Sequence, residues 1–367
     1  MKILALESSA DETGISVVDF DGNHLHVEKN LIASQIDMHR EYGGIVPNLA
    51  GKYHAENIMP LLHEADIDPD QIDLIAVTAG PGLMPCLVVG VSAANALSYS
   101  WNKPLIGIHH IEGHIYANWI AKAKPQFPAL ALVVSGGHTQ LMLMRDHFDY
   151  EIIGQTVDDA VGEAYDKAAR LLGLPYPGGP EIDRRAVAYA ENHDTAEASA
   201  LLPRPMLHSG DYDFSFSGLK TAVLYAVRDY QKSELLEKGH VASSIGKTEY
   251  ESVDFPEDFV TMMCYAFQEA ASDVLITKTL KAASEYGIRS ILLAGGVSAN
   301  SYLRSQLESQ ISALNDDMSF HVPDLEYCLD NAAMIAAAAA YRWNQMSNIQ
   351  RKSYEKSTIS ANPNLTL

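Results

Sequence analysis

The feature that most constrains the fold is a strand–turn–strand pattern that occurs twice in the chain. Residues 2–20 contain an apolar stretch, the polar turn SSADE and a second apolar stretch, and residues 129–153 repeat this design around the turn SGGHTQ. Each segment predicts an antiparallel hairpin. The recurrence predicts two similar halves whose turns face a shared cleft. Apolar stretches alternate with helical ones between and after the hairpins, which indicates an α/β fold with mixed sheets.

The length of 367 residues suits two compact domains or one large duplicated one. We expect an N-terminal lobe over residues 1–127 and a C-terminal lobe over residues 128–330, with the polar segment at about 231–254 as a surface excursion. A helix rich in small residues at 331–346 is expected to pack back on the body. Residues 347–367 are expected to form a polar, frayed tail.

The charge and the cysteines narrow the class of protein. The formal net charge is −21, whereas a protein that grips nucleic acid unaided usually has a basic balance. Binding to nucleic acid would therefore require a basic partner or a small basic patch on this chain. Three widely spaced cysteines imply neither a disulfide framework nor a CxxC zinc pair. Without a run of about 18 apolar residues or the blocks of a signal peptide, we expect a cytoplasmic protein with no membrane role.

The stretch IHHIEGHIYA at residues 108–117 is a candidate metal site. On a helix, His110 and His114 would lie one turn apart on the same face, as two ligands of one metal require. Two surface histidines on one helix would give the same pattern. A metallopeptidase needs a glutamate directly after the first histidine, but Ile111 occupies that position, and Glu112 would point about 200° away from His110.

Three Gly-rich turns, at residues 77–82, 133–140 and 292–300, each follow an apolar strand. Glycine at such a turn lets main-chain N–H groups approach a phosphate or ribose closely. The chain contains neither GxxxxGK[ST] nor a GxGxxG after the first strand, which argues against a P-loop ATPase and a dinucleotide-binding fold.

Carboxylates gather in polar turns: Glu7, Asp11 and Glu12 in the first hairpin, Asp158 and Asp159 before one helix, and Asp330 before the last. Helix capping accounts well for Asp158 and Asp330. It does not account for acids in the first hairpin turn, which would meet the second Gly-rich turn. Acids that face a phosphate cleft usually bind a cation or act as a base.

Eight stretches, which occur in the family's order and cover most of residues 3–340, resemble the family of TsaD-type tRNA N6-adenosine threonylcarbamoyltransferases. They are ALESSADET, AGPG, HHIEGHIYA, VVSGGHTQL, VGEAYDKAARLLGLPYPGGPEIDR, FSFSGLKTA, LAGGVSANSYLR and CLDNAAMIA. The resemblance implies a two-lobed actin/Hsp70/sugar-kinase fold around a nucleotide cleft. One departure is Ala10, which stands where the family usually has a cysteine, so a thiol nucleophile is excluded there.

The resemblance also implies the site. His110, His114 and Asp330 would bind one divalent metal, Fe2+ or Zn2+, that holds the substrate rather than cutting peptides. Asp11 and Glu12 are the candidate catalytic acids. The implied substrate contacts are Val133, Val134, Ser135, Gly136, Gly137, Asp166, Gly179, Asp183 and Asn300. For Asp183, the residues alone favour a solvated position beside Arg184 and Arg185. Lys167 and Arg170 would meet tRNA phosphates or form surface salt bridges.

The implied reaction transfers a threonylcarbamoyl group from threonylcarbamoyl-AMP to N6 of adenosine 37 in tRNAs that read ANN codons. The implied partners are tRNA, a TsaB-like paralogue and a TsaE-like P-loop ATPase. Three alternatives remain open: a small-molecule kinase of the same fold, a zinc metallopeptidase that lacks its adjacent glutamate, and a non-catalytic scaffold. A scaffold would be expected to have lost the metal residues, which this chain keeps.

Overall fold

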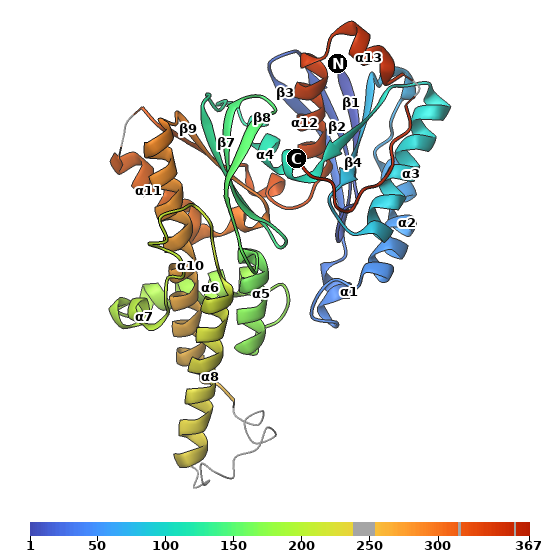
Figure 1. Cartoon of the computed structure of the whole chain (residues 1–367). Helices are drawn as coiled ribbons and strands as arrows, with labels where there is room; N and C mark the ends of the chain where they lie inside the picture. Colours follow the sequence, from blue (N-terminus) through green and yellow to red (C-terminus); the bar gives the residue numbers. More distant parts are fainter. Residues whose placement is uncertain (238–253, 315–316, 356) are drawn as a thin grey trace.

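Two five-stranded mixed sheets with the same strand order form the centre of the molecule (Figure 1). In this computed structural model, which describes residues 1–237, 254–314, 317–355 and 357–367, the orders are β3-β2-β1-β4-β5 and β8-β7-β6-β9-β10. In each sheet three strands form an antiparallel meander: β1, β2 and β3 in the first sheet, and β6, β7 and β8 in the second. The other two strands run parallel to β1 in the first sheet and to β6 in the second. The predicted duplication and the α/β class are confirmed. The strands are β1 (Lys2–Glu7), β2 (Glu12–Phe20), β3 (Leu25–Ser34), β4 (Leu74–Gly80), β5 (Leu105–His109), β6 (Ala129–Val134), β7 (Thr139–Asp146), β8 (Asp149–Gln155), β9 (Ser290–Ala294) and β10 (Ser319–His321).

Helices cover the outer face of each sheet. Helices α2 and α3 pack on the first sheet, and a larger group packs on the second (Figure 1). Among the described residues, the helices of six residues or more are α2 (Pro47–Glu64), α3 (Met84–Trp101), α4 (His110–Tyr116), α5 (Val161–Leu171), α6 (Gly178–Asn192), α7 (Ala196–Leu201), α8 (Ser217–Glu237), α10 (Glu257–Tyr286), α11 (Ser301–Leu314), α12 (Ala332–Gln345) and α13 (Asn348–Ser353); the short α1 spans Ile36–Arg40.

Two helices, α4 and α12, lie between the sheets, and each crosses to the other half. Helix α4 follows β5 of the first sheet yet also contacts β6 and β9, whereas α12 follows the second half and packs on β1 and β2. The run AAMIAAAAA at the start of α12 is fully buried, and its small side chains allow close approach. The inner faces of both sheets therefore share one core. The expected division into lobes over residues 1–127 and 128–330, followed by the helical segment 331–346, stays a prediction.

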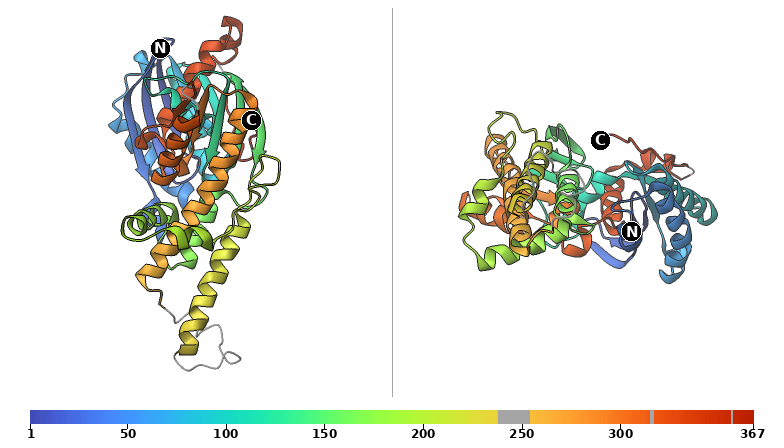
Figure 2. Two further views of the ribbon diagram at one scale, coloured as in Figure 1. Left: turned by 90° about the vertical axis from the view of Figure 1, so that its left-hand side faces the viewer. Right: turned by 90° about the horizontal axis from the view of Figure 1, so that it is seen from below.

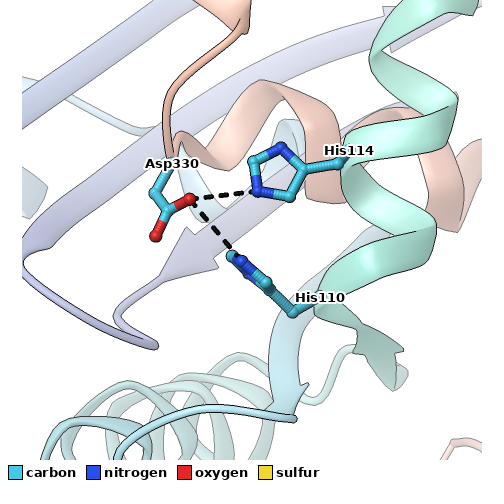
Figure 3. A group of neighbouring side chains, drawn as sticks. All are labelled: His110, His114 and Asp330. Carbon is cyan, nitrogen blue, oxygen red and sulfur yellow. Dashed lines mark ion pairs between the residues drawn. The ribbon is translucent and has the colours of Figure 1, made fainter. Parts of the chain in front are cut away.

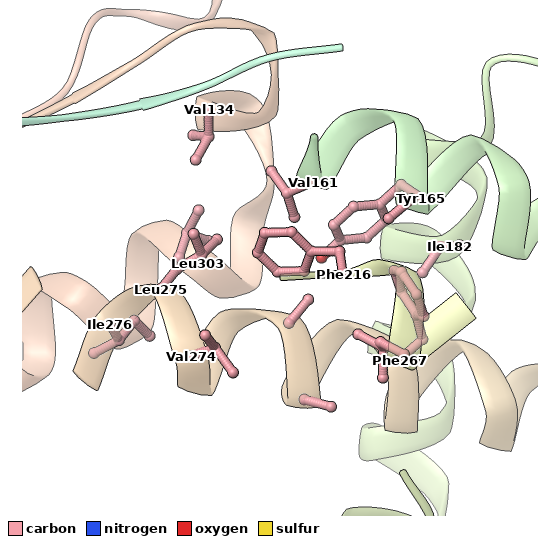
Figure 4. Close-up of a cluster of buried hydrophobic side chains, with 14 of the residues drawn as sticks. Val134, Val161, Tyr165, Ile182, Phe216, Phe267, Val274, Leu275, Ile276 and Leu303 are labelled. Atoms are coloured by element: carbon pink, nitrogen blue, oxygen red, sulfur yellow. The ribbon is translucent and has the colours of Figure 1, made fainter. Parts of the chain in front are cut away.

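The second half has its own core around the 30-residue helix α10 (Figure 4). Phe267 of α10 meets Tyr165 of α5 edge to face, with ring centroids 4.9 Å apart. Helix α10 ends at Gly287, as predicted, because that residue adopts the left-handed conformation that glycine tolerates. Helix α8 projects from the body (Figure 2) and contains residues 231–237 of the expected surface excursion, while residues 238–253 lie outside the described part.

The expectation that residues 347–367 are frayed is wrong. Helix α13 begins this segment, and the chain then runs along β4, β5 and α3, ending between the two sheets (Figure 1). Its main chain bonds to the first sheet: Leu105 N–H donates to the Tyr354 carbonyl at 3.4 Å, and Asn362 N–H donates to the Ala79 carbonyl at 2.8 Å. No helix among the described residues is long and apolar enough to cross a membrane.

Candidate metal centre and substrate cleft

Helix α4 and the loop before α12 bring three metal-ligand side chains together (Figure 3). His114 Nε2 lies 3.1 Å and His110 Nε2 lies 3.5 Å from the same oxygen, Oδ1 of Asp330. The three ligand atoms lie within 4.8 Å of one another. The predicted helical spacing thus places both imidazoles on one face, and the fold supplies the carboxylate.

Asp330 does not cap helix α12, so the capping interpretation of this residue is wrong. The N-cap is Asn331, whose Oδ1 accepts the N–H of Met334 at 3.0 Å and whose Nδ2 donates to the Leu329 carbonyl at 2.7 Å. Because Asn331 satisfies the helix start and holds the loop before it, the Asp330 carboxylate is left to face the histidines.

A second layer of groups orients His110. Ser9 Oγ lies 3.1 Å and Glu7 Oε2 lies 3.5 Å from its Nδ1. The buried Glu7 carboxylate also accepts the Ser9 N–H at 2.6 Å and the Thr78 hydroxyl. Sequence reasoning grouped Glu7 with the other hairpin acids but missed this role, since no local pattern pairs it with a histidine far along the chain.

The electrostatics of the cluster fit a cation. Burial alone would lower the pKa of His110, but the charges of Asp330 and Glu7 outweigh it and raise this pKa to about 9. Burial alone would raise the pKa of Asp330, but both histidines hold it well below its usual range. The Asp330 carboxylate is therefore ionised, and a metal ion bound here would replace the proton on the His110 imidazole. Two imidazole nitrogens with one carboxylate oxygen form a donor set that suits Zn2+ or Fe2+.

Asp11 and Glu12, the candidate catalytic acids, are buried in the first hairpin turn beside this cluster. Burial, the hydrogen bond from Glu12 to Asp11 and the negative charges of Asp11 and Asp330 raise the pKa of Glu12 well above its usual range. Burial and Asp330 also raise the pKa of Asp11, although the bond from Glu12 opposes this. The raised pKa of Glu12 favours its protonated form, which can donate a hydrogen bond to Asp11.

The glycines expected at the substrate are open. A Cβ atom added at Gly136, Gly137 or Gly179 would meet nothing within 4 Å. Ser135 closes its turn, because its hydroxyl accepts the His138 N–H at 3.1 Å. The side chains of Val133 and Val134 are fully buried in the two cores, so neither side chain is open to a ligand.

Three other expected contact residues hold helix ends. Asp166 accepts the N–H of Gly178 at the start of α6, at 2.7 Å. Asp183 accepts the hydroxyl of Ser301 at the start of α11, at 2.9 Å, so it is not merely solvated as the residues alone suggested. The buried Asn300 donates to Gln268 at 2.7 Å and accepts the N–H of Leu303 at 2.8 Å. The structure thus places all three at the junctions of α5, α6 and α11.

Two acids outside the cluster serve structural roles. The capping interpretation of Asp158 is wrong, because Asp158 does not cap α5, the helix that follows it. It instead accepts the N–H groups of Phe216 and Ser217 at the start of α8, at 2.8 and 3.2 Å. Glu112 is buried in an ion pair with Arg342 of α12, away from the metal ligands. A peptidase base is therefore missing from α4, as its sequence predicted.

Lys167 and Arg170 of α5 and Lys220 of α8 line a cavity of about 230 Å³ together with apolar side chains. Lys167 forms salt bridges with Asp159 at 2.9 Å and with Glu163 at 2.8 Å. Lys220 pairs with the same Asp159 at 3.1 Å. Asp159 thus joins Lys167 to Lys220 across this groove, while Arg170 donates a hydrogen bond to the Gly43 carbonyl.

The matching family model and the curated relatives agree on one family. Residues 26–337 match the model of the family described as TsaD, tRNA N6-adenosine threonylcarbamoyltransferase. A protein of that name from Bacillus licheniformis is 48% identical over 340 residues, which cover 92% of this chain and 90% of that protein. One from Geobacillus kaustophilus is 45% identical over 370 residues, covering 100% and 96%. Among solved structures, full-length HypF in its phosphate- and nucleotide-bound form matches with a TM-score of 0.45 and 13% identity, over 94% of this chain and 55% of that one.

Proposed function

Since this chain belongs to the family of tRNA N6-adenosine threonylcarbamoyltransferases, we propose that it transfers a threonylcarbamoyl group from threonylcarbamoyl-AMP to N6 of adenosine 37 in tRNAs that read ANN codons. The product is N6-threonylcarbamoyladenosine. The observation that carries the proposal is the cluster of His110, His114 and Asp330 beside the acid pair Asp11 and Glu12, in a family of transferases. Within the part of the chain that the structure describes, no feature favours the kinase alternative.

His110, His114 and Asp330 would hold one divalent ion per subunit, Fe2+ or Zn2+. When bound, the ion would supply a Lewis acid that holds and polarises a donor oxygen. Ser9 and Glu7 would keep His110 Nε2 turned toward it, which is the usual task of groups behind a metal ligand.

The carbonyl of the donor is already activated by its AMP leaving group, so the protein needs to align the amine and take one proton. The N6 nitrogen forms the new bond to the carbonyl carbon, the bond to the AMP phosphate oxygen breaks, and the amine loses a proton. We assign the proton to the Asp11 carboxylate. Glu12 stays protonated and donates a hydrogen bond to Asp11, because its pKa is raised well above neutral.

The nucleotide part of the donor is proposed to lie against the turn at 133–137 and against Gly179, because Gly136, Gly137 and Gly179 have open space where a side chain would lie. Asp166, Asp183 and Asn300 would add polar contacts to ribose or purine through acceptor positions beyond those that hold the helix ends.

The groove of Lys167, Arg170 and Lys220 is the proposed place for tRNA phosphates. Part of this groove is formed by α5, and the N–H of Gly162 in α5 donates to the carbonyl of Ser135 in the 133–137 turn. Helix α5 therefore connects the proposed substrate cleft to the proposed tRNA groove. A net charge of −21 suits a subunit that recruits tRNA together with partners, proposed as a TsaB-like paralogue and a TsaE-like ATPase. Because its substrate is tRNA, we place the enzyme in the cytoplasm.

The test is a transfer assay with the purified chain, unmodified tRNA that reads ANN codons, and synthetic threonylcarbamoyl-AMP, with nucleoside mass spectrometry as the readout. Wild type is expected to form the modified adenosine. The variant Asp11→Asn should lose at least about a hundredfold in rate, as general-base loss does. The variant His114→Ala should also lose most of its activity, because it removes a proposed metal ligand. Glu308→Gln, an exposed acid on α11, is the matched control. The proposal fails if wild type forms no product even with the two partner proteins added.

A further inference from the structure

His109 connects the end of the described chain to the metal-ligand helix. Its Nδ1 accepts the N–H of Ile111 at 3.2 Å, which makes His109 the N-cap of α4. Its Nε2 lies 3.0 Å from the main-chain carbonyl of Leu365. A ring nitrogen that accepts an N–H bond carries no proton itself, so Nε2 carries the ring proton and donates to Leu365. The Leu365 carbonyl therefore selects the one neutral tautomer that can cap α4.

The segment that delivers Leu365 is firmly anchored. Asn95 of α3 donates to the Ile359 carbonyl at 2.9 Å and accepts the Ile359 N–H at 3.0 Å. A Cβ at Gly80 would lie 1.8 Å from the carbonyl oxygen of Asn362, so only glycine admits the segment at this point. Residues 359–365, here called the tail strap, thus lie in a fixed position between α3, β4 and His109.

We propose that His109 and the tail strap position the metal ligands. Helix α4 has only seven residues, too few to be stable alone, and its first and fifth residues are His110 and His114. A helix this short takes its start and direction from its N-cap, so the strap fixes where both imidazoles point. His109 is a positioning residue, and the inference rests on the proposed metal site.

Three variants separate the two bonds of His109. His109→Ala removes both the cap and the bond to the strap. His109→Asn keeps a side chain that caps well but is too short to reach Leu365. Deletion of residues 358–367 leaves His109 in place and removes its acceptor. His321→Ala, which removes a buried histidine from β10 of the other sheet, is the matched control.

The measurement is the affinity of the full chain for Zn2+ and Co2+ by competition with a chelator, together with the visible spectrum of bound Co2+. We expect His109→Ala and the deletion each to weaken binding about tenfold or more and to alter the spectrum, as loss of outer groups at metal sites does. The two changes combined should cost little more than either alone, because they break one linkage. His109→Asn should fall between wild type and His109→Ala.

Thermal unfolding, followed by circular dichroism, identifies any variant that has lost its fold. Such a variant is left out, and the metal affinities of the folded variants decide. The inference is overturned if folded His109→Ala or the folded deletion binds metal within twofold of wild type with an unchanged Co2+ spectrum, or if His109→Asn binds metal more weakly than His109→Ala. A wild type that binds neither ion at this site would instead refute the proposed metal centre, and the inference with it.

Discussion

Replacing Glu12 by glutamine should make the stability of the protein less sensitive to pH. In the folded state burial and neighbouring negative charge raise the pKa of Glu12, so the folded chain keeps a proton that the unfolded chain releases above about pH 4.5. The folded state then binds more protons, and its stability falls as pH rises. Across pH 5 to 8 one retained proton corresponds to at most about 4 kcal/mol, at about 1.4 kcal/mol per pH unit. Glutamine cannot ionise, yet it still donates a hydrogen bond toward Asp11.

Urea unfolding of the chelator-treated protein at pH 5, 6.5 and 8 measures this effect. Wild type should lose stability steadily from pH 5 to pH 8, while Glu12→Gln should lose less and be the more stable protein at pH 8. Glu308→Gln, which removes an exposed carboxylate, should follow wild type. Equal slopes for wild type and Glu12→Gln would show that Glu12 is ionised in the folded protein, and the assignment of Asp11 as the base would fall with it.

Three further changes test other parts of the structure. Lys220→Gln should weaken tRNA binding several-fold and reduce the slope of log affinity against log salt by about one, both measured by filter binding. Lys281→Gln, at the far end of α10, is the control and should change neither the affinity nor the slope. Asp330→Ala should lower bound metal, measured by elemental analysis after dialysis, from about one ion per chain to nearly none, since a ligand is lost. Phe267→Ala should destabilise the second half by about 3–5 kcal/mol in urea unfolding, because a fully buried ring is removed; a loss under 1 kcal/mol would contradict the packing described.

Local patterns predicted much of the fold because they report on local physics. Two strand–turn–strand stretches predicted two similar sheets, and a spacing of four predicted that His110 and His114 share a helix face. Asp330 was different: only the resemblance suggested it, because its approach depends on the chain's return from the second sheet to α12. The capping rule gave the wrong role for Asp330, since its neighbour Asn331 is an equally good cap and takes the position.

The tail was mispredicted for a related reason. Its polar side chains suggested fraying, but main-chain hydrogen bonds and a glycine at position 80 hold it on the first sheet. Such bonds use groups that every residue carries, so hydropathy does not reveal them. Glu7 was likewise visible as an acid in the first hairpin, but its contact with His110 follows from the pairing of β1 with β4 and of β4 with β5.

The exchange of α4 and α12 between the halves has a consequence for synthesis on the ribosome. The last strand of the first sheet, β5, ends at His109, whereas α12, which covers the inner face of this sheet, ends only at Gln345. At about 5–20 residues per second, roughly 12 to 50 s separate the two. For that time the part of the apolar inner face that α12 covers, on β1 and β2, lacks its partner, so the nascent chain should be held by chaperones until α12 emerges and closes both halves together.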